Sequence, residues 1–172
     1  VTARMNAPYV KQYVEEREQR VLFLGDVSAS MACGSCGRRK DELATEVAAV
    51  LAFSAITNGD RAGLTLFSSA QELHIPARKG RRHGLRLLRE LVATERRDRR
   101  TDIRTALEAC FRATTRRAVV FLISDFADTG YDHALRLLAR KHDVTAIRVR
   151  DRPEQYPARH GPKGADHPET DR

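Results

Sequence analysis

The sequence predicts an α/β fold in which a doubly wound, mostly parallel sheet is covered by helices on both faces. Two apolar runs, at residues 21–24 and 118–123, are continuous rather than alternating, as in strands whose two faces are both buried. Segments with helical periodicity separate these runs from the other predicted strands. Because parallel strands need crossover connections, this alternation places helices on both faces of the sheet.

The first predicted helix covers Lys40–Thr57 and ends at Asn58 and Gly59, since both residues readily adopt the left-handed conformation of a helix terminus. Its larger apolar residues recur near a period of 3.6, so we expect them to face the core. They are Leu43, Val47, Leu51 and Ile56. Strands are predicted at 62–67 and 72–75, and the Ser-Ser turn between them indicates a hairpin at the sheet edge.

The second half of the chain continues the alternation. Leucine and alanine spacing predicts helices at 80–92, 102–113 and 131–140, and a last strand is predicted at 143–149. The helix at 80–92 carries Leu85, Leu87, Leu88 and Leu91. In the helix at 131–140, we expect Ala134, Leu135 and Leu138 to face inward.

Length and composition indicate one globular domain of 172 residues, 41% hydrophobic and 31% charged. We expect 1–19 to be an N-terminal extension, the remnant of an upstream segment, 20–150 to form the domain, and 151–172 to form a polar strap or tail. No apolar run approaches the roughly 20 residues that span a bilayer, and three cysteines do not favour a disulfide framework. Together these features predict a cytoplasmic location.

The formal net charge of +8 is concentrated between residues 78 and 117, where arginine is frequent and acidic residues are few. Such a surface suits an acidic protein partner or a nucleic acid. Nucleic acid is the less favoured, because no aromatic residue that could stack on bases lies between the basic ones before Phe111. The chain has neither a phosphate-binding loop motif nor a dinucleotide-binding glycine motif, so we do not expect it to use ATP or NAD.

Oxygen-bearing side chains follow both apolar runs. Asp26, Ser28 and Ser30 stand at every second position after the first run, and Asp125 follows the second. The carboxyl ends of neighbouring parallel strands face one crevice, and Thr101 precedes a helix that could begin at the same edge. If the loops converge, the five side chains could bind one Mg²⁺, which prefers oxygen ligands. The alternative is that the first three residues only form a turn and cap the following helix.

These residues and their surroundings resemble the metal-ion-dependent adhesion site of von Willebrand factor A domains, and most of all the bacterial branch known as domain-of-unknown-function family 58. The matching segments, in order from residue 1 to 154, are VTAR, YVKQYVEERE, DVSASM, GDRAGLTLFS, IPARKGRRH, TDIRTAL, RAVVFLISDF, ARKHDVTAIRVRD and RPE. The resemblance implies a sheet of about six strands between two helical layers. It also implies that Asp26, Ser28 and Ser30 form a first metal loop, Thr101 a second and Asp125 a third. The implied metal is Mg²⁺, with Mn²⁺ or Ca²⁺ as substitutes.

The function implied by the resemblance is a non-enzymatic protein-interaction domain that works with MoxR-type AAA+ ATPases in a chaperone-like role, the assembly or maturation of protein complexes. An acidic side chain of the ATPase or its client would complete the metal shell, and no catalytic residues are implied. Two features depart from the family pattern. Arg99 and Arg100 precede Thr101 where many A domains have glycines, and Cys33 and Cys36 follow the metal loop. Zinc would need two further ligands, so the cysteine pair is a weak zinc or redox signal.

Two other functions stay open. A metal-dependent phosphoester hydrolase of the same fold could use Asp26 as a nucleophile, although Ser28 stands where such enzymes have a second acid. A nucleic-acid-binding module could use the arginine-rich region, and its binding would be strongly salt-dependent.

Three further residues receive structural interpretations. His142 and Asp143 are expected to form a capping or hydrogen-bonding pair at a helix-to-strand turn, since no nucleophile accompanies them. His83 is expected to face solvent, and Cys110 to be a small buried residue.

Overall fold

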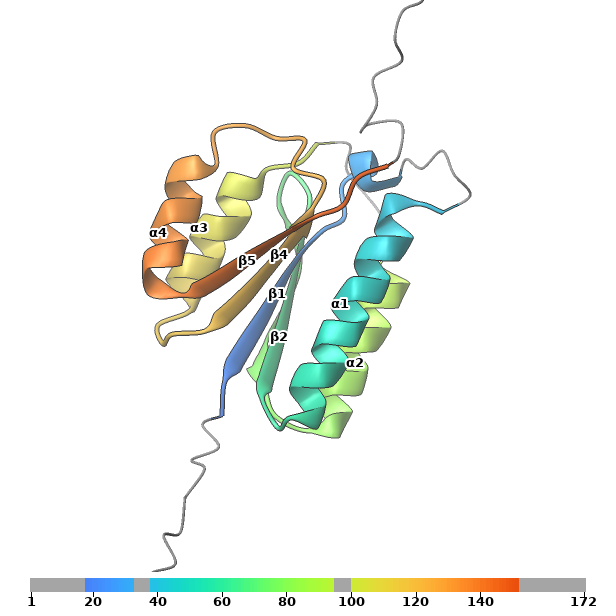
Figure 1. Ribbon diagram of the computed structural model, residues 1–172, viewed down its shortest axis with the longest axis vertical. Coiled ribbons are helices and arrows are strands. Elements are labelled where there is room, and N and C mark those ends of the chain that lie inside the picture. Colours follow the sequence, from blue (N-terminus) through green and yellow to red (C-terminus); the bar gives the residue numbers. More distant parts are fainter. Residues whose placement is uncertain (1–17, 33–37, 95–99, 152–172) are drawn as a thin grey trace, which may run out of the picture.

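The computed structural model describes residues 18–32, 38–94 and 100–151 (Figure 1). The strands are β1 (Arg20–Asp26), β2 (Arg61–Phe67), β3 (Gln71–Arg78), β4 (Val119–Ser124) and β5 (Asp143–Arg148). The helices are α1 (Lys40–Thr57), α2 (Arg81–Ala93), α3 (Ile103–Ala113), α4 (Asp132–Lys141) and a short 3₁₀ helix, η1 (Ala29–Ala32). Every predicted strand and longer helix is present, with ends that differ by at most three residues.

The strand order is β3-β2-β1-β4-β5, and all neighbours are parallel except β2 and β3, which form an antiparallel hairpin at one edge. The chain therefore builds outward from β1 first to one edge and then to the other, which places helices on both faces. The predicted α/β class and the edge hairpin are confirmed. The described part of the chain contributes five strands, where the resemblance implied about six.

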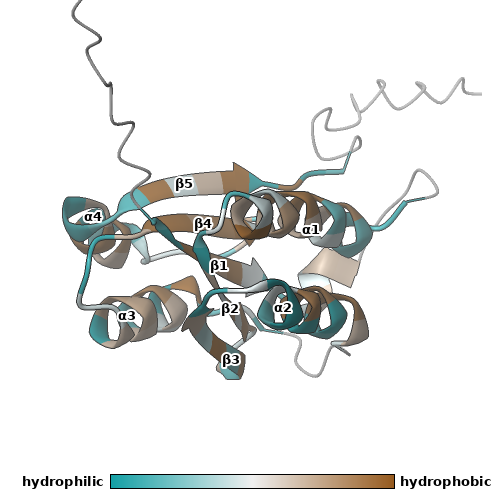
Figure 2. Cartoon of the chain, turned by 90° about the horizontal axis from the view of Figure 1, so that it is seen from below, coloured by the Kyte–Doolittle hydropathy of each residue, from teal (hydrophilic) through white to brown (hydrophobic). Residues whose placement is uncertain are grey.

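The helices form two layers, with α1 and α2 on one face of the sheet and α3 and α4 on the other (Figures 1 and 2). Successive side chains of β1 alternate between these layers, as the pleat of a strand requires. Phe23 packs with the α1–α2 layer and Leu24 with the α3–α4 layer, and both are almost fully buried. Both faces of the central strands are thus covered, which explains their continuous apolar sequences.

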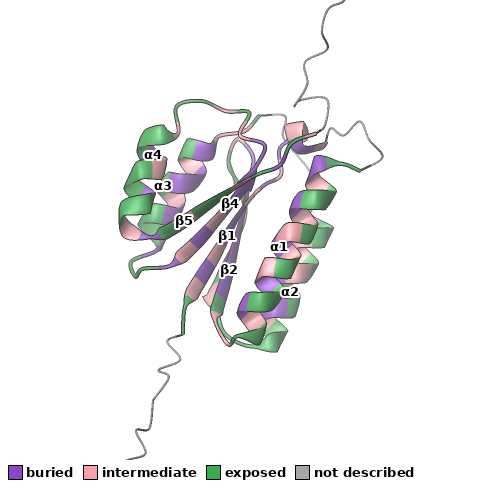
Figure 3. Cartoon of the chain, in the orientation of Figure 1, coloured by how far each residue is buried: buried purple, intermediate pink, exposed green. Residues whose placement is uncertain are grey.

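Helix α1 contacts the sheet through alanines rather than through its larger apolar residues. The buried alanines are Ala44, Ala48, Ala52 and Ala55. Leu43 is exposed, contrary to the prediction, and Val47, Leu51 and Ile56 are only partly buried. Buried, intermediate and exposed residues alternate along α1 (Figure 3). Small side chains let the helix lie close to the strands. Periodicity did not reveal this arrangement because apolar residues occur all around α1.

Close packing of α1 predicts a specific sensitivity at Ala52, which has no exposed surface. Ala52→Leu should lower the free energy of unfolding by about 1–3 kcal/mol, because the larger side chain must be accommodated between helix and sheet. Urea denaturation followed by circular dichroism measures this change. The matched control is Val50→Leu, at a position 69% exposed on the same helix, which should change stability by less than about 0.5 kcal/mol. Equal stability of the two variants would contradict close packing.

Two histidines have surroundings that differ from those predicted. His83 is half-buried, with Nε2 lying 2.9 Å from the carbonyl oxygen of Ala62, so the expectation that it faces solvent is wrong. His142 is 2% exposed, and among the described residues neither of its ring nitrogens has a hydrogen-bond partner. Asp143 instead forms an ion pair with Arg117. The hydrogen-bonding alternative is therefore wrong for the two side chains, whereas the capping alternative is confirmed, because His142 is the C-cap of α4 and Asp143 begins β5.

The buried position of His142 predicts a pH dependence of stability. Burial lowers its pKa, the positive charge of Lys141 lowers that pKa further, and Asp143 opposes the shift. In the unfolded chain a histidine titrates near 6.5, so between this value and the lowered pKa the unfolded state binds more protons. Stability present above about pH 6.5 is therefore lost as the pH falls towards the lowered pKa.

Urea denaturation at about pH 7.5 and about pH 5 measures this effect. The loss of unfolding free energy between these conditions should be smaller for His142→Leu than for the wild type. His133→Leu, which removes an exposed histidine of α4, should behave like the wild type. An identical pH dependence in all three proteins would mean that His142 does not contribute.

Candidate metal centre

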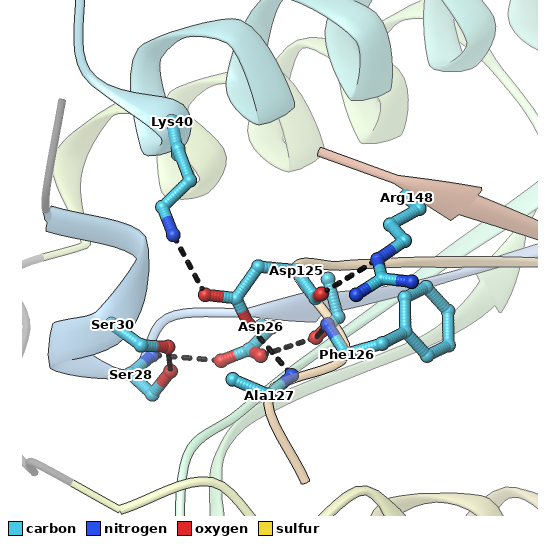
Figure 4. A network of polar contacts seen from close by, with 9 residues as sticks. Asp26, Ser28, Ser30, Lys40, Asp125, Phe126, Ala127 and Arg148 are labelled. Carbon is cyan, nitrogen blue, oxygen red and sulfur yellow. Dashed lines mark hydrogen bonds and ion pairs between the residues drawn. The ribbon is translucent and has the colours of Figure 1, made fainter. Parts of the chain in front are cut away.

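Three loops from separate parts of the chain meet at one edge of the sheet. Asp26 is the last residue of β1, and Asp125 directly follows the neighbouring strand β4. Strand β2 ends beside them, since the backbone N–H of Val27 donates to the carbonyl oxygen of Phe67 at 2.8 Å. The side chains that follow β1 and β4 therefore face each other across a short space (Figure 4).

Asp26 is 5% exposed and both of its carboxylate oxygens accept hydrogen bonds. The backbone N–H of Ser28 donates to Oδ1 at 2.9 Å, and the hydroxyl of Ser124 donates to Oδ2 at 2.6 Å. Burial raises the pKa of Asp26 and the negative charge of Asp125 adds to this rise, while the bonds from Ser124 and Ser28 oppose it. An ionised Asp26 at this position therefore favours a nearby cation.

The two serines of the first loop lie beside this carboxylate. Ser28 is fully buried, and its Oγ lies 3.0 Å from Oγ of Ser30. The 3₁₀ helix η1 begins at Ala29 and holds both side chains on one side of the loop (Figure 4). Their hydroxyl oxygens retain lone pairs that a cation could accept.

Asp125 is held by one contact within its own loop and by contacts from two other segments. Its Oδ1 accepts a hydrogen bond from the backbone N–H of Ala127 at 3.1 Å, and its carbonyl oxygen accepts one from Nε of Arg148 at 3.2 Å. Its Oδ2 lies 3.0 Å from Nζ of Lys40, the first residue of α1. The following residue, Phe126, has a φ of 57°, a conformation uncommon for an aromatic residue, and its N–H donates to Ser124.

Thr101, the remaining predicted ligand, lies on the loop before α3 at the same edge. The next residue, Asp102, donates its backbone N–H to the carbonyl oxygen of Ser68, which follows β2. Asp128, from the loop that follows β4, accepts the backbone N–H of Ile103 at 2.9 Å. These bonds tie the Thr101 loop to the segments that follow β2 and β4. No hydrogen bond among the described residues joins the Thr101 side chain to the other four candidates. The structure therefore brings four predicted ligands together and places the fifth on an adjoining loop.

The residues at this edge fit a hard divalent cation. They provide the buried carboxylates of Asp26 and Asp125 and two hydroxyls, those of Ser28 and Ser30, all of which are oxygen donors. Within the described ranges, no group of three or more His, Cys, Asp or Glu side chains could hold a metal ion. An all-oxygen donor set therefore suits a divalent cation.

Two residues of this cluster were missed by sequence analysis. Ser124 immediately precedes Asp125, so its position at the strand end was a signal that one hydroxyl would reach the neighbouring loop. Lys40 opens a helix, where a positive charge opposes the helix dipole. That unfavourable placement was a signal that Lys40 has a local negative partner.

The first part of the arginine-rich region, from Arg78 to Arg89, forms a separate surface at the opposite end of the sheet. Arg78 pairs with Ala62 near the start of β2, which places it at the amino ends of the parallel strands. A shallow groove of about 700 Å³ there is lined by Arg78, Lys79, Arg82, His83, Leu85, Arg86 and Arg89. The basic surface is therefore distinct from the candidate metal centre.

The cysteines add no second metal site to the described structure. Cys33 and Cys36 lie outside the described residues. Cys110 is buried, as predicted, and burial raises its pKa to about 11, which keeps the thiol protonated near neutral pH.

The strand order and the two helical layers define a von Willebrand A-like fold. The chain belongs to the family described as protein of unknown function DUF58, which it matches over residues 1–172. It is 34% identical over 154 residues to an uncharacterized protein of Mycobacterium bovis and to one of Mycobacterium tuberculosis. These matches cover 88% of this chain and 49% of each relative, so the chain spans about half the length of its curated relatives.

Solved structures share the fold at low sequence identity. The conserved hypothetical protein BatB from Bacteroides thetaiotaomicron superposes with a TM-score of 0.64 at 17% identity, covering 76% of this chain and 66% of that one. An aerotolerance-related membrane protein from Bacteroides fragilis gives 0.65 at 18%, covering 76% and 67%. Proximal thread matrix protein 1 from the mussel byssus, with a zinc-occupied metal-ion-dependent adhesion site, gives 0.57 at 18%, covering 75% and 37%.

The predicted cytoplasmic location is wrong. A solved structure with this fold is described as a membrane protein, so the fold is not restricted to the cytoplasm. Cysteine content and the lack of a long apolar run in this chain therefore do not assign a compartment. In the described part of the chain, no helix is both long and apolar enough to cross a membrane.

The donor set predicts that Mn²⁺ binds to this edge and stabilises the fold. At about 100 times the dissociation constant, the metal should add about 2.7 kcal/mol to the free energy of unfolding. Isothermal titration calorimetry gives the affinity and thermal unfolding gives the stabilisation. Asp26→Asn should weaken binding at least tenfold, because a buried negative charge next to the cation is removed. Asp132→Asn, which removes an exposed carboxylate of α4, should bind like the wild type, and equal weakening in both variants would contradict the site.

Proposed function

We propose that this chain is a non-enzymatic, metal-dependent protein-interaction domain in which Asp26, Ser28, Ser30, Thr101 and Asp125 hold Mg²⁺, with Mn²⁺ or Ca²⁺ as substitutes. The observation that supports it best is the meeting of two buried carboxylates and two hydroxyls at the carboxyl edge of β1 and β4. Edges of this kind are where open α/β sheets bind ligands.

The residues of the chain would have separate tasks at such a site. Asp26 is oriented by the Ser28 N–H and the Ser124 hydroxyl, so its carboxylate is fixed before a ligand arrives. The hydroxyls of Ser28 and Ser30 are neutral donors, which leave a bound cation with most of its positive charge. When bound, the divalent cation would supply an electrophilic position that a carboxylate from a partner can occupy.

The proposed partner is a MoxR-type AAA+ ATPase or its client, which would offer a glutamate or aspartate to the metal. The resemblance to the family 58 branch supports this choice, and the proposed role is chaperone-like assembly or maturation of protein complexes. The basic groove beside α2 would favour a partner with an acidic surface, because complementary charge steers association.

The basic groove also supports one alternative, a nucleic-acid-binding module. Its cationic side chains include Arg78, Lys79, Arg82, Arg86 and Arg89. Such binding would fall steeply with salt and would not depend on the opposite edge of the sheet, where Asp26 lies.

Affinity capture from native lysate distinguishes these functions. Tagged wild-type chain and the Asp26→Asn and Asp132→Asn variants are compared in Mg²⁺ and in EDTA. We expect an AAA+ ATPase to be recovered in Mg²⁺ by the wild type and Asp132→Asn, with at least tenfold less for Asp26→Asn or in EDTA. Equal recovery of a protein partner in EDTA would reject a metal-dependent interface. Recovery of nucleic acid alone, released by salt and unaffected by Asp26→Asn, would favour the alternative.

A further inference from the structure

A buried lysine forms an ion pair with Asp125, which is also a proposed ligand of the candidate metal centre. Lys40 is 6% exposed, and its Nζ lies 3.0 Å from Oδ2 of Asp125, whose side chain is 4% exposed (Figure 4). An ammonium group this deeply buried is costly unless a charged, hydrogen-bonded partner compensates it. Asp125 meets that need, and the ammonium in turn compensates one of two neighbouring buried carboxylates.

The position of Lys40 makes this contact a built feature of the fold. Lys40 is the first residue of α1, where the helix dipole disfavours a positive charge. The alanine face of α1 holds the helix close to the sheet, which brings its first turn over the end of β4. The other basic side chain at Asp125, that of Arg148, is exposed and donates to the backbone carbonyl oxygen rather than to the carboxylate.

The ammonium and a divalent cation would compete for the same negative charge. Coulomb repulsion between two cations that share one carboxylate is strong in a buried site, where screening by water is weak. A single positive charge in this position is therefore expected to weaken divalent-cation binding by about tenfold or more.

We infer that the ammonium group of Lys40 neutralises Asp125 when no metal is bound. Lys40 thereby stabilises the metal-free edge and lowers the affinity of that edge for a divalent cation. This inference rests on the proposed function, because it concerns the regulation of the same site. A carboxylate delivered by a partner would offset the repulsion, so that metal and partner bind more tightly together than either binds alone.

The first measurement is Mn²⁺ affinity, determined by calorimetry on the full chain. Lys40→Met keeps the aliphatic stem and removes the charge, so it should tighten Mn²⁺ binding about tenfold or more. Lys40→Arg keeps the charge and should leave the affinity within about threefold of the wild type. Lys141→Met, at the far end of α4, is the matched control and should have no effect. If Lys40→Met folds poorly, Lys40→Gln removes the charge while keeping a donor for Asp125.

The second measurement is thermal unfolding in EDTA and in saturating Mn²⁺. In EDTA, Lys40→Met should unfold at a lower temperature than the wild type and Lys141→Met, because Asp125 is left buried without its cation. Mn²⁺ should raise the unfolding temperature of Lys40→Met more than that of the wild type. A purely structural lysine would give the loss in EDTA without the tighter binding.

The outcomes separate this inference from the proposed function. If the wild type binds Mn²⁺ and Asp26→Asn does not, while Lys40→Met binds equally or more weakly, the inference about Lys40 is overturned and the metal site stands. If neither the wild type nor Lys40→Met binds Mn²⁺, both proposals are overturned. Unchanged unfolding of Lys40→Met in EDTA would also overturn the inference, because the ion pair would then not support the metal-free edge.

Discussion

The parallel pairing of β1 with β4 at the centre of the sheet is the constraint on which the polar edge depends. In-register pairing from Val21 opposite Val119 to Gly25 opposite Ile123 ends both strands at the same level. Asp26 and Asp125 are thereby placed beside each other, although almost a hundred residues separate them in the chain. Ser124 fastens the arrangement, because its hydroxyl donates to Asp26 and accepts the N–H of Phe126. Without this pairing the two carboxylates would be unrelated loop residues.

Burial makes it energetically costly for both neighbouring carboxylates to carry a negative charge. Burial is the main reason why the pKa of Asp26 is raised, and repulsion from the neighbouring carboxylate of Asp125 adds to that rise. The ammonium group of Lys40 compensates part of this negative charge, and the packing of α1 determines whether that group can reach Asp125. The small residues on the inner face of α1 are therefore linked to the chemistry of the edge, since they set how near the helix lies to the sheet. The packing of α1 against the sheet and the geometry of the polar edge therefore depend on each other.

Charge is distributed unevenly between the two ends of the sheet. Buried carboxylates gather at the carboxyl ends of β1 and β4, whereas exposed arginines line the groove at the amino ends of the parallel strands. Opposite polarity at the two ends would orient an approaching partner, because long-range electrostatics acts before close contact.

The sequence by itself determined the order of strands and helices, the two buried central strands, the edge hairpin and the family, because periodicity and local motifs are properties of neighbouring residues. It also identified the ligand candidates. Asp26, Ser28 and Ser30 could be recognised as a local motif, because all three lie on one loop. Tertiary structure alone decided which face of α1 is buried and that Lys40 is paired with Asp125. It also decided that His142 is buried without a partner among the described residues and that Thr101 lies on an adjoining loop. These features depend on how separate elements pack, and no local pattern encodes the distance between them.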